Sequence, residues 1–135
     1  MTVSVGGIKG VSADLAAKLQ AQGIDNSDEL LEKAKTTAAR RELAAKLGID
    51  AKAVLELANR ADLIRIKGIG GVYSDLLENA GVDTVKELAA RVPANLGAKL
   101  AEINAEKKLT NRPPTAEMVA EWVDQAKALP KILEY

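Results

Sequence analysis

The amino-acid sequence predicts an all-α protein, and three observations carry that prediction. Alanine and leucine are abundant, whereas phenylalanine is absent and aromatic residues make up only 2% of the 135 positions. Apolar residues recur at the spacing of helix faces rather than in the alternating pattern of strands. Glycines and N-capping residue types separate these periodic stretches. The hydrophobic share of 47% excludes a disordered chain.

Two helices with marked ends are predicted near the start of the chain. The first runs from Ala13 to Gln22, because Ser12 is a good N-cap and Gly23 stands where a helix end favours a left-handed residue. The second begins after Asn26, and Glu29 follows three residues later, as in a capping box. These residues have a purely structural interpretation, since caps and C-terminal glycines mark the ends of most helices.

The middle of the chain shows the same pattern of C-terminal glycine and N-cap residues. Helices are predicted at 37–47 and 51–64, and Gly48-Ile49-Asp50 stands between them as a C-terminal glycine, an apolar contact and an N-cap. The two helices therefore form a short hairpin.

The last part of the chain is expected to end in a helix and a docked tail. One helix ends near Glu106, and the longest loop follows at 107–115. Thr115 can cap the final helix, in which Trp122 lies on the apolar face and is interpreted as a core residue. The tail, 129–135, is apolar, so we expect it to dock on the body of the protein or on a partner.

The stretch from Ile66 to Leu88 organises the chain. Within it, Gly68-Ile69-Gly70 separates a helix that ends at Ile64 from a helix that starts near Gly71, which predicts the tight connection of a helix-hairpin-helix unit. Glycine has two uses at such a turn. It adopts positive φ without steric cost, and it bares backbone N–H groups that can bind an anion beside a helix N-terminus. Both interpretations stay open.

A weaker copy of this stretch opens the protein. With an offset of 66 − 8 = 58 positions and no gaps, residues recur at the turn glycine, the C-terminal glycine and the capping positions, which indicates a repeated supersecondary unit. The matches pair Ile8 with Ile66, Lys9 with Lys67, Gly10 with Gly68, Leu19 with Leu77, Gly23 with Gly81, Asp25 with Asp83, Glu29 with Glu87 and Leu30 with Leu88. Gly70-Gly71 becomes Ser12-Ala13, so we expect the first copy to bind a phosphate less well.

The repeat divides the chain into two similar halves, residues 1–61 and 62–135. A chain segment of this size buries only a modest share of its surface when it folds alone. We therefore expect the two halves to share one core.

Three segments, Leu63–Gly70, Leu76–Ala89 and Trp122–Pro130, resemble the bacterial domain-of-unknown-function family numbered 4332, and the resemblance covers essentially the whole chain. The central motif is also similar to the hairpin in the N-terminal domain of archaeal and eukaryotic recombinases, and to hairpins of repair polymerases and ligases, which hold the DNA backbone through loop amides. The resemblance implies tandem helix-hairpin-helix repeats in a SAM-like orthogonal helical bundle. It also implies a sequence-independent contact with nucleic acid.

The candidate phosphate-binding residues are the loop glycines and the basic residues beside them. They are Arg65, Lys67, Gly68, Gly70 and Gly71 in the second hairpin, and Lys9 and Gly10 in the first. Arg60 and Arg65 have a second interpretation, as solvated charges on a helix face. Asp62, Asp75 and Glu78 are near in the sequence and would weaken a positive field around the hairpin.

The composition argues against catalysis. Histidine and cysteine are absent, which removes the commonest general base, thiolate chemistry and the commonest neutral metal ligand. Acidic pairs such as Glu102 and Glu106 lie on one helix face rather than across a cleft. We expect no enzyme, no cofactor, no metal site and no small-molecule substrate.

No run of apolar residues approaches membrane-spanning length, so we expect a soluble, cytoplasmic protein without a membrane partner. Two binding functions stay open for it. The first is weak, sequence-independent binding of duplex nucleic acid. It would be weak because 19 basic and 19 acidic residues cancel, leaving no strongly basic footprint. The second is a protein–protein interaction, a scaffold role or self-association with no nucleic acid. Salt-sensitive duplex binding favours the first, and salt-tolerant association through an apolar patch favours the second.

Overall fold

A computed structural model describes residues 2–135 of the chain, and this range folds into eight α-helices and one short 3-10 helix, Val5–Gly7. The α-helices are α1 (Ala13–Ala21), α2 (Ser27–Lys33), α3 (Thr37–Leu47), α4 (Ala51–Ile64), α5 (Gly71–Asn79), α6 (Val85–Ala89), α7 (Pro93–Lys107) and α8 (Ala116–Ala128). An isolated antiparallel bridge joins Ser4 and Asn26, and no strand forms within 2–135. The all-α prediction is confirmed.

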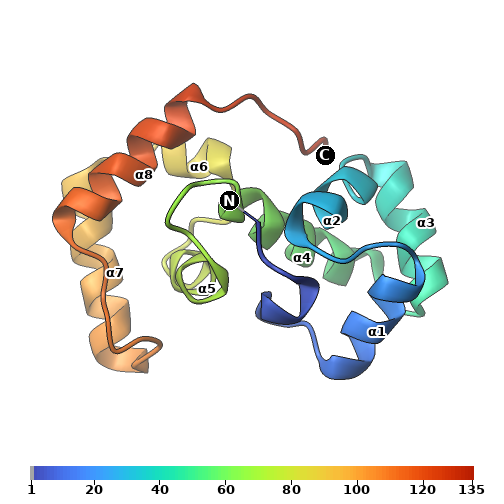
Figure 1. Ribbon diagram of the computed structural model, residues 1–135. Helices are drawn as coiled ribbons and strands as arrows, with labels where there is room; N and C mark the ends of the chain where they lie inside the picture. The colour runs from blue at the N-terminus through green and yellow to red at the C-terminus, as the bar shows by residue number, and fades with distance from the viewer. Residues whose placement is uncertain (1) are drawn as a thin grey trace.

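The helices form two groups that meet at α4. Figure 1 shows α1–α3 on one side of the molecule and α5–α8 on the other, with α4 extending from the centre into the first group. α4 packs against α2 and α3 and also against α5, while α8 packs against α6 and α7. This arrangement makes α4 the central helix of the fold.

The buried apolar residues form two clusters, and α4 contributes to both. Leu57, Ala61 and Ile64 belong to the cluster of the first group, whereas Leu63 belongs to the cluster of the second. An apolar face at three- and four-residue spacing is what a helix needs to pack on its neighbours. Whether the two clusters unfold as one unit stays a prediction.

The sequence repeat is also a repeat of backbone structure. Adding the offset of 58 to the bounds of α1 gives those of α5, 13 + 58 = 71 and 21 + 58 = 79, and α2 and α6 start at Ser27 and Val85 with the same offset. The turn glycines Gly10 and Gly68 have φ of 93° and 100°. The glycines that follow α1 and α5 also have positive φ. Local sequence therefore produces the same helix bounds and the same positive-φ positions twice.

The predicted N-caps are confirmed. The side chains of Ser12, Asn26 and Thr115 each accept a hydrogen bond from the backbone N–H three residues later, at 2.9 to 3.1 Å. Glu29 accepts from the N–H of Asp25 rather than from that of Asn26, so the capping box is shifted by one residue. Each cap satisfies a donor that the helix itself leaves without a partner.

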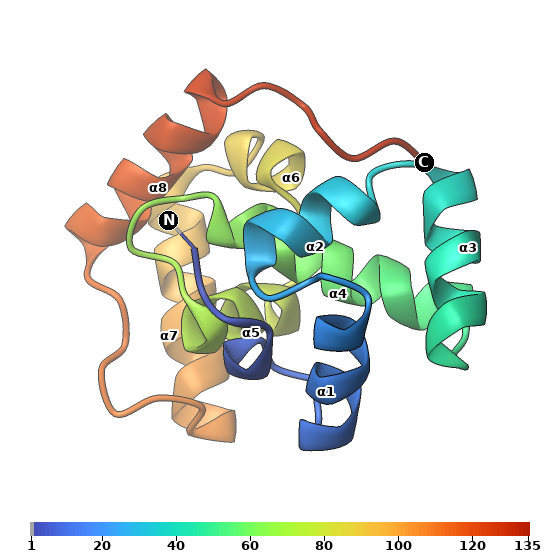
Figure 2. The same cartoon turned by 45° about the vertical axis from the view of Figure 1, so that its right-hand side comes forward.

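The C-terminal segment, 129–135, crosses from α8 back to the first helix group, as both views show (Figures 1 and 2). Leu133 is only 3% exposed and joins the first cluster. Glu134 donates its N–H to the carbonyl of Lys35 at 2.7 Å and accepts a bond from Arg40 at 2.6 Å. Of the two expectations for the tail, docking on the body of the protein is the one observed.

Within residues 2–135, no helix combines the length and the apolar character needed to cross a lipid bilayer.

Candidate functional site

The loop between α4 and α5 is held by its neighbours while its lysine faces solvent. Ile66 and Ile69 are fully buried and anchor the loop. Gln125 on α8 accepts a hydrogen bond from the backbone N–H of Lys67 at 2.9 Å and donates one to its carbonyl at 3.1 Å. Because these bonds use only the backbone of Lys67, its exposed ammonium group is left for other contacts.

Gly68 is required by the path of the loop. Its φ of +100° disfavours any residue with a Cβ, and a Cβ there would lie 3.1 Å from Nε1 of Trp122. Trp122 is 2% exposed, and its ring packs against that of Tyr73 with centroids 5.2 Å apart. The prediction of Trp122 as a core residue is confirmed.

The N-terminus of α5 has no side-chain cap. Gly70 occupies the N-cap position and makes no side-chain hydrogen bond, so the helix must find other acceptors for its first N–H groups. A Cβ at Gly71 would lie 2.0 Å from the carbonyl oxygen of Gly7, which shows how closely the N-terminal segment crosses here. Gly68 is exposed, whereas Gly70 and Gly71 are half-buried. Position 71 therefore requires glycine because of this close backbone contact, which the sequence did not reveal.

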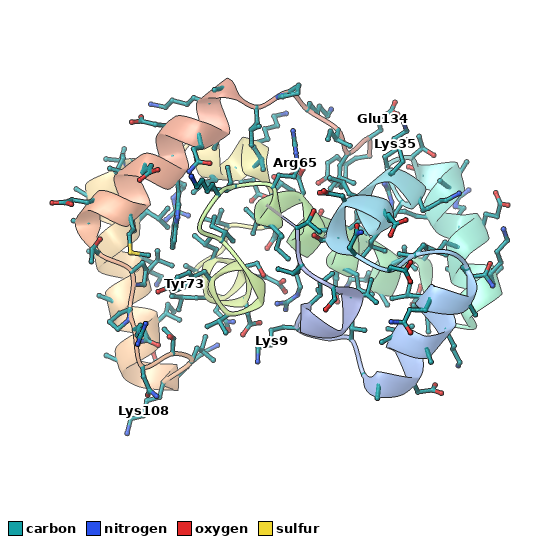
Figure 3. All side chains as sticks on the ribbon, in the orientation of Figure 1. Lys9, Lys35, Arg65, Tyr73, Lys108 and Glu134 are labelled. Atoms are coloured by element: carbon teal, nitrogen blue, oxygen red, sulfur yellow. The ribbon has the colours of Figure 1, made fainter. Side chains whose placement is uncertain are left out.

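The first copy of the loop lies next to the second and is built differently. The approach of Gly7 to Gly71 brings the two together, and Figure 3 shows Lys9 beside α5. Lys9 and Gly10 are both exposed. At the start of α1, however, the hydroxyl of Ser12 accepts from the N–H of Leu15 at 3.1 Å. α1 thus has an acceptor for one of its first N–H groups, whereas α5 has no side-chain cap for the equivalent group.

Arg65 is engaged in structural contacts. Its Nη1 donates to Oδ1 of Asp62 at 2.9 Å, its Nη2 donates to the carbonyl of Pro130 at 2.6 Å, and its side chain is only 10% exposed. The other oxygen of Asp62 accepts from the N–H of Val85, the first residue of α6. Arg65 therefore connects α4 to the C-terminal segment, and its interpretation as a solvated charge is wrong.

Arg60 is likewise no solvated charge. It pairs with Asp75 at 2.7 Å and with Glu78 at 2.9 Å, and these contacts connect α4 to α5. Burial raises the pKa of Glu78, while the positive charge of Arg60 acts in the opposite direction. The sequence placed these acids near the hairpin but gave no sign that they bind this arginine. Of the basic residues near the second loop, Lys67 is the one whose charged group faces solvent.

The proline-containing loop after α7 lies beside α5, which the sequence did not predict. The hydroxyl of Tyr73 donates to the carbonyl of Arg112 at 2.7 Å, and two hydrogen bonds between Asn104 and Thr110 hold the loop to α7. Lys108 and Arg112 are exposed in this loop (Figure 3 labels Tyr73 and Lys108). A contact through a tyrosine hydroxyl leaves no periodic signal in a sequence, so only the structure finds it.

The acidic side chains within residues 2–135 do not gather in a group of three or more that could hold a metal ion.

The sequence model of the family described as Domain of unknown function (DUF4332) matches residues 9–129. Neither a search of curated proteins nor a search of solved structures finds a match.

Proposed function

Because the chain belongs to the DUF4332 family, whose description assigns no activity, we propose from the geometry alone that it is a non-enzymatic binding module with tandem helix-hairpin-helix repeats. Its second hairpin contacts the backbone of duplex nucleic acid weakly and without sequence preference. The observation that carries this proposal is the start of α5, where Gly70 supplies no cap and Lys67 is exposed beside it.

The physical reason lies in the helix N-terminus. The first N–H groups of a helix have no acceptor within the helix, and the helix dipole favours a negative charge there. A phosphate oxygen can accept from these groups, and the ammonium of Lys67 adds a charge-assisted contact. At α1 the hydroxyl of Ser12 already accepts from Leu15, so that end offers less to a phosphate. The two hairpins should therefore contribute unequally.

The affinity should be low because few cations take part. Arg65 contacts Asp62 and Pro130, and Arg60 is paired with two carboxylates. Lys67 and Lys9 remain as the exposed basic residues of the two loops. If two or three phosphates are neutralised, the plot of log affinity against log salt should have a slope of roughly −2 to −3.

Fluorescence anisotropy with a short labelled duplex tests the proposal. Lys67→Glu should abolish binding at low salt, whereas Lys9→Glu should reduce it only slightly. Lys99→Glu, which makes the same charge change at an exposed position on α7, should leave it unchanged. Equal losses in the Lys67 and Lys9 variants would contradict the asymmetry between the hairpins. Absence of binding by the unaltered protein at low salt would reject the nucleic-acid function.

The second candidate is a protein-interaction or scaffold module without a nucleic-acid role. It is favoured by Val72, which is 40% exposed in the first turn of α5, and by the neutralised arginines nearby. An apolar contact of this kind is insensitive to salt. Concentration-dependent association of the protein, unchanged between low and moderate salt and lost in Val72→Ser, would support it.

A further inference from the structure

A cavity of about 230 Å³ lies between α6, α8 and the C-terminal segment. In Figure 1 this segment leaves α8 and passes above α6 on its way to the first helix group. Residues 129–133 and Tyr135 of the segment line one side of the cavity. Most of the lining is apolar. The apolar residues include Val85, Ala89, Ala126, Leu129, Ile132 and Leu133.

The charged residues that line this cavity are mainly positive. Lys86, Lys127 and Lys131 line it from three different parts of the chain, and all three are exposed. None of the ion pairs formed within residues 2–135 involves them. The lining carboxylate is that of Asp62, and its two oxygens already accept from Arg65 and from the N–H of Val85.

We propose that this cavity binds a free medium-chain carboxylic acid. The alkyl chain lies among the apolar residues of α6 and α8, and the carboxylate lies at the lysines. An apolar interior with a few charged groups at its edge is the usual composition of a small-molecule site. The volume is below that of sites for drug-sized ligands, which range from roughly 300 to 1,000 Å³, and this suits a single short chain.

This inference is independent of the proposed nucleic-acid contact. The cavity is lined by none of the hairpin residues Lys67, Gly68, Gly70 and Gly71. It shares only Arg65 with the predicted phosphate-binding residues, and the guanidinium of Arg65 is engaged with Asp62 and Pro130 (Figure 3 labels Arg65 below the C-terminal segment).

Calorimetric titration of the full chain with octanoate, below the concentration at which it forms micelles, is the first test. Octanoate should bind, and hexanoate should bind more weakly by up to about fourfold for each CH₂ removed, because each buried CH₂ contributes to affinity. Octylammonium should bind at least about tenfold more weakly than octanoate, since its charge is repelled by the lysines. Equal affinity for the two octyl compounds, or no heat of binding, would overturn the proposal.

Variants then locate the site. Lys127→Glu should weaken octanoate binding about fivefold, while the same change at Lys99, on α7 and outside the lining, should not alter it. Ala89→Leu should block binding by filling the cavity at a half-buried position, with the thermal midpoint as the check that the variant is folded. If Ala89→Leu is unfolded, the comparison of octanoate affinity between Lys127→Glu and Lys99→Glu shows whether the cavity is the binding site. Equal losses of octanoate affinity in the Lys127 and Lys99 variants would reject this site. Binding of the protein to anionic phospholipid vesicles but not to octanoate would reject the free acid as the ligand.

Discussion

At the scale of single residues, two glycines of the second repeat are needed for different physical reasons. Gly81 has φ of +88°, and a Cβ there would meet nothing within 4 Å. A substitution at Gly81 therefore strains only the local backbone. Gly71 begins a helix in an ordinary conformation, but a Cβ would lie 2.0 Å from the carbonyl oxygen of Gly7. A substitution at Gly71 must therefore move one part of the backbone away from another.

Gly71→Ala should lower the free energy of unfolding by about 2 to 3 kcal/mol, because an overpacked contact with backbone atoms cannot relax by a side-chain rotation. Gly97→Ala is the matched control. Gly97 lies inside α7 with nothing within 4 Å of a Cβ, so alanine should stabilise the protein by about 0.5 to 1 kcal/mol. Urea unfolding measures both changes. An equal effect of the two substitutions would show that the Gly7 contact does not constrain Gly71.

Gly81→Ala and Gly23→Ala should each cost about 1 kcal/mol, since both glycines end a helix with positive φ. Neither position offers a steric clash, so the two losses should be similar. Thermal unfolding of each variant provides the measurement. Unchanged midpoints for both would argue that these helix ends tolerate a Cβ, contrary to the left-handed geometry.

Glu78 should give the stability a recognisable pH dependence. Burial raises its pKa above the value of 4.5 that it has when unfolded, although Arg60 lowers it. A raised carboxyl pKa means that the stability contributed by protonated Glu78 is fully present below pH 4.5 and is lost as the pH rises through the folded pKa. As the pH rises from about 4 to about 7, the unaltered protein should lose a contribution that Glu78→Gln does not lose. The free energy of unfolding of Glu78→Gln should therefore increase relative to that of the unaltered protein over this range. The opposite trend would mean that the Arg60 pair dominates.

At the scale of elements, α6 shows how a short helix is stabilised by the rest of the fold. Its five residues are too few for a stable isolated helix. Thr84 accepts from the N–H of Glu87, and Asp62 on α4 accepts from the N–H of Val85 at 2.9 Å. The buried Leu88 packs its apolar side into the second cluster. The helix thus depends on a carboxylate from another element.

Asp62→Ala should destabilise the protein by about 3 kcal/mol, because it leaves the guanidinium of Arg65 buried without its partner. Removing both partners in Asp62→Ala/Arg65→Ala should cost less than the sum of the two single substitutions, since the residues interact directly. Chemical denaturation of the three variants completes the cycle. Additive losses would contradict the coupling between the two side chains.

The same elements explain what the sequence could predict. The N-caps Ser12, Asn26 and Thr115 and the helix bounds of the repeat depend on neighbouring residues, so a local pattern was enough to find them. The pairing of Arg60 with Asp75 joins residues on different helices, and the contact of Asp62 with Val85 spans 23 positions. Such contacts depend on how helices pack and have no fixed spacing. The candidate loop was therefore located, but the arginines around it were misinterpreted.

At the scale of the whole molecule, the two helix groups are joined by α4 and by the C-terminal segment. α4 places Leu57 and Ile64 in the first cluster and Leu63 in the second. The C-terminal segment returns from α8 to place Leu133 in the first cluster. Figure 3 shows Glu134 of this segment beside Lys35 at the end of α2. The second half of the chain, residues 62–135, thus supplies Ile64 and Leu133 to the cluster formed mainly by the first half.

The burial of Ile64 and Leu133 in the first cluster, together with the pairing of Arg60 with Asp75 and Glu78, predicts that the halves do not fold independently. A fragment of residues 62–135 keeps α5–α8 but loses nearly all of α4, including Arg60, and it leaves Leu133 without the cluster that buries it. We expect the fragment to lack a sharp unfolding transition in urea, since a small domain has little surplus stability to lose. The full chain should unfold in one transition, with circular dichroism and Trp122 fluorescence changing together. A fragment that unfolds at the same urea concentration as the full chain would show that α5–α8 form a domain on their own.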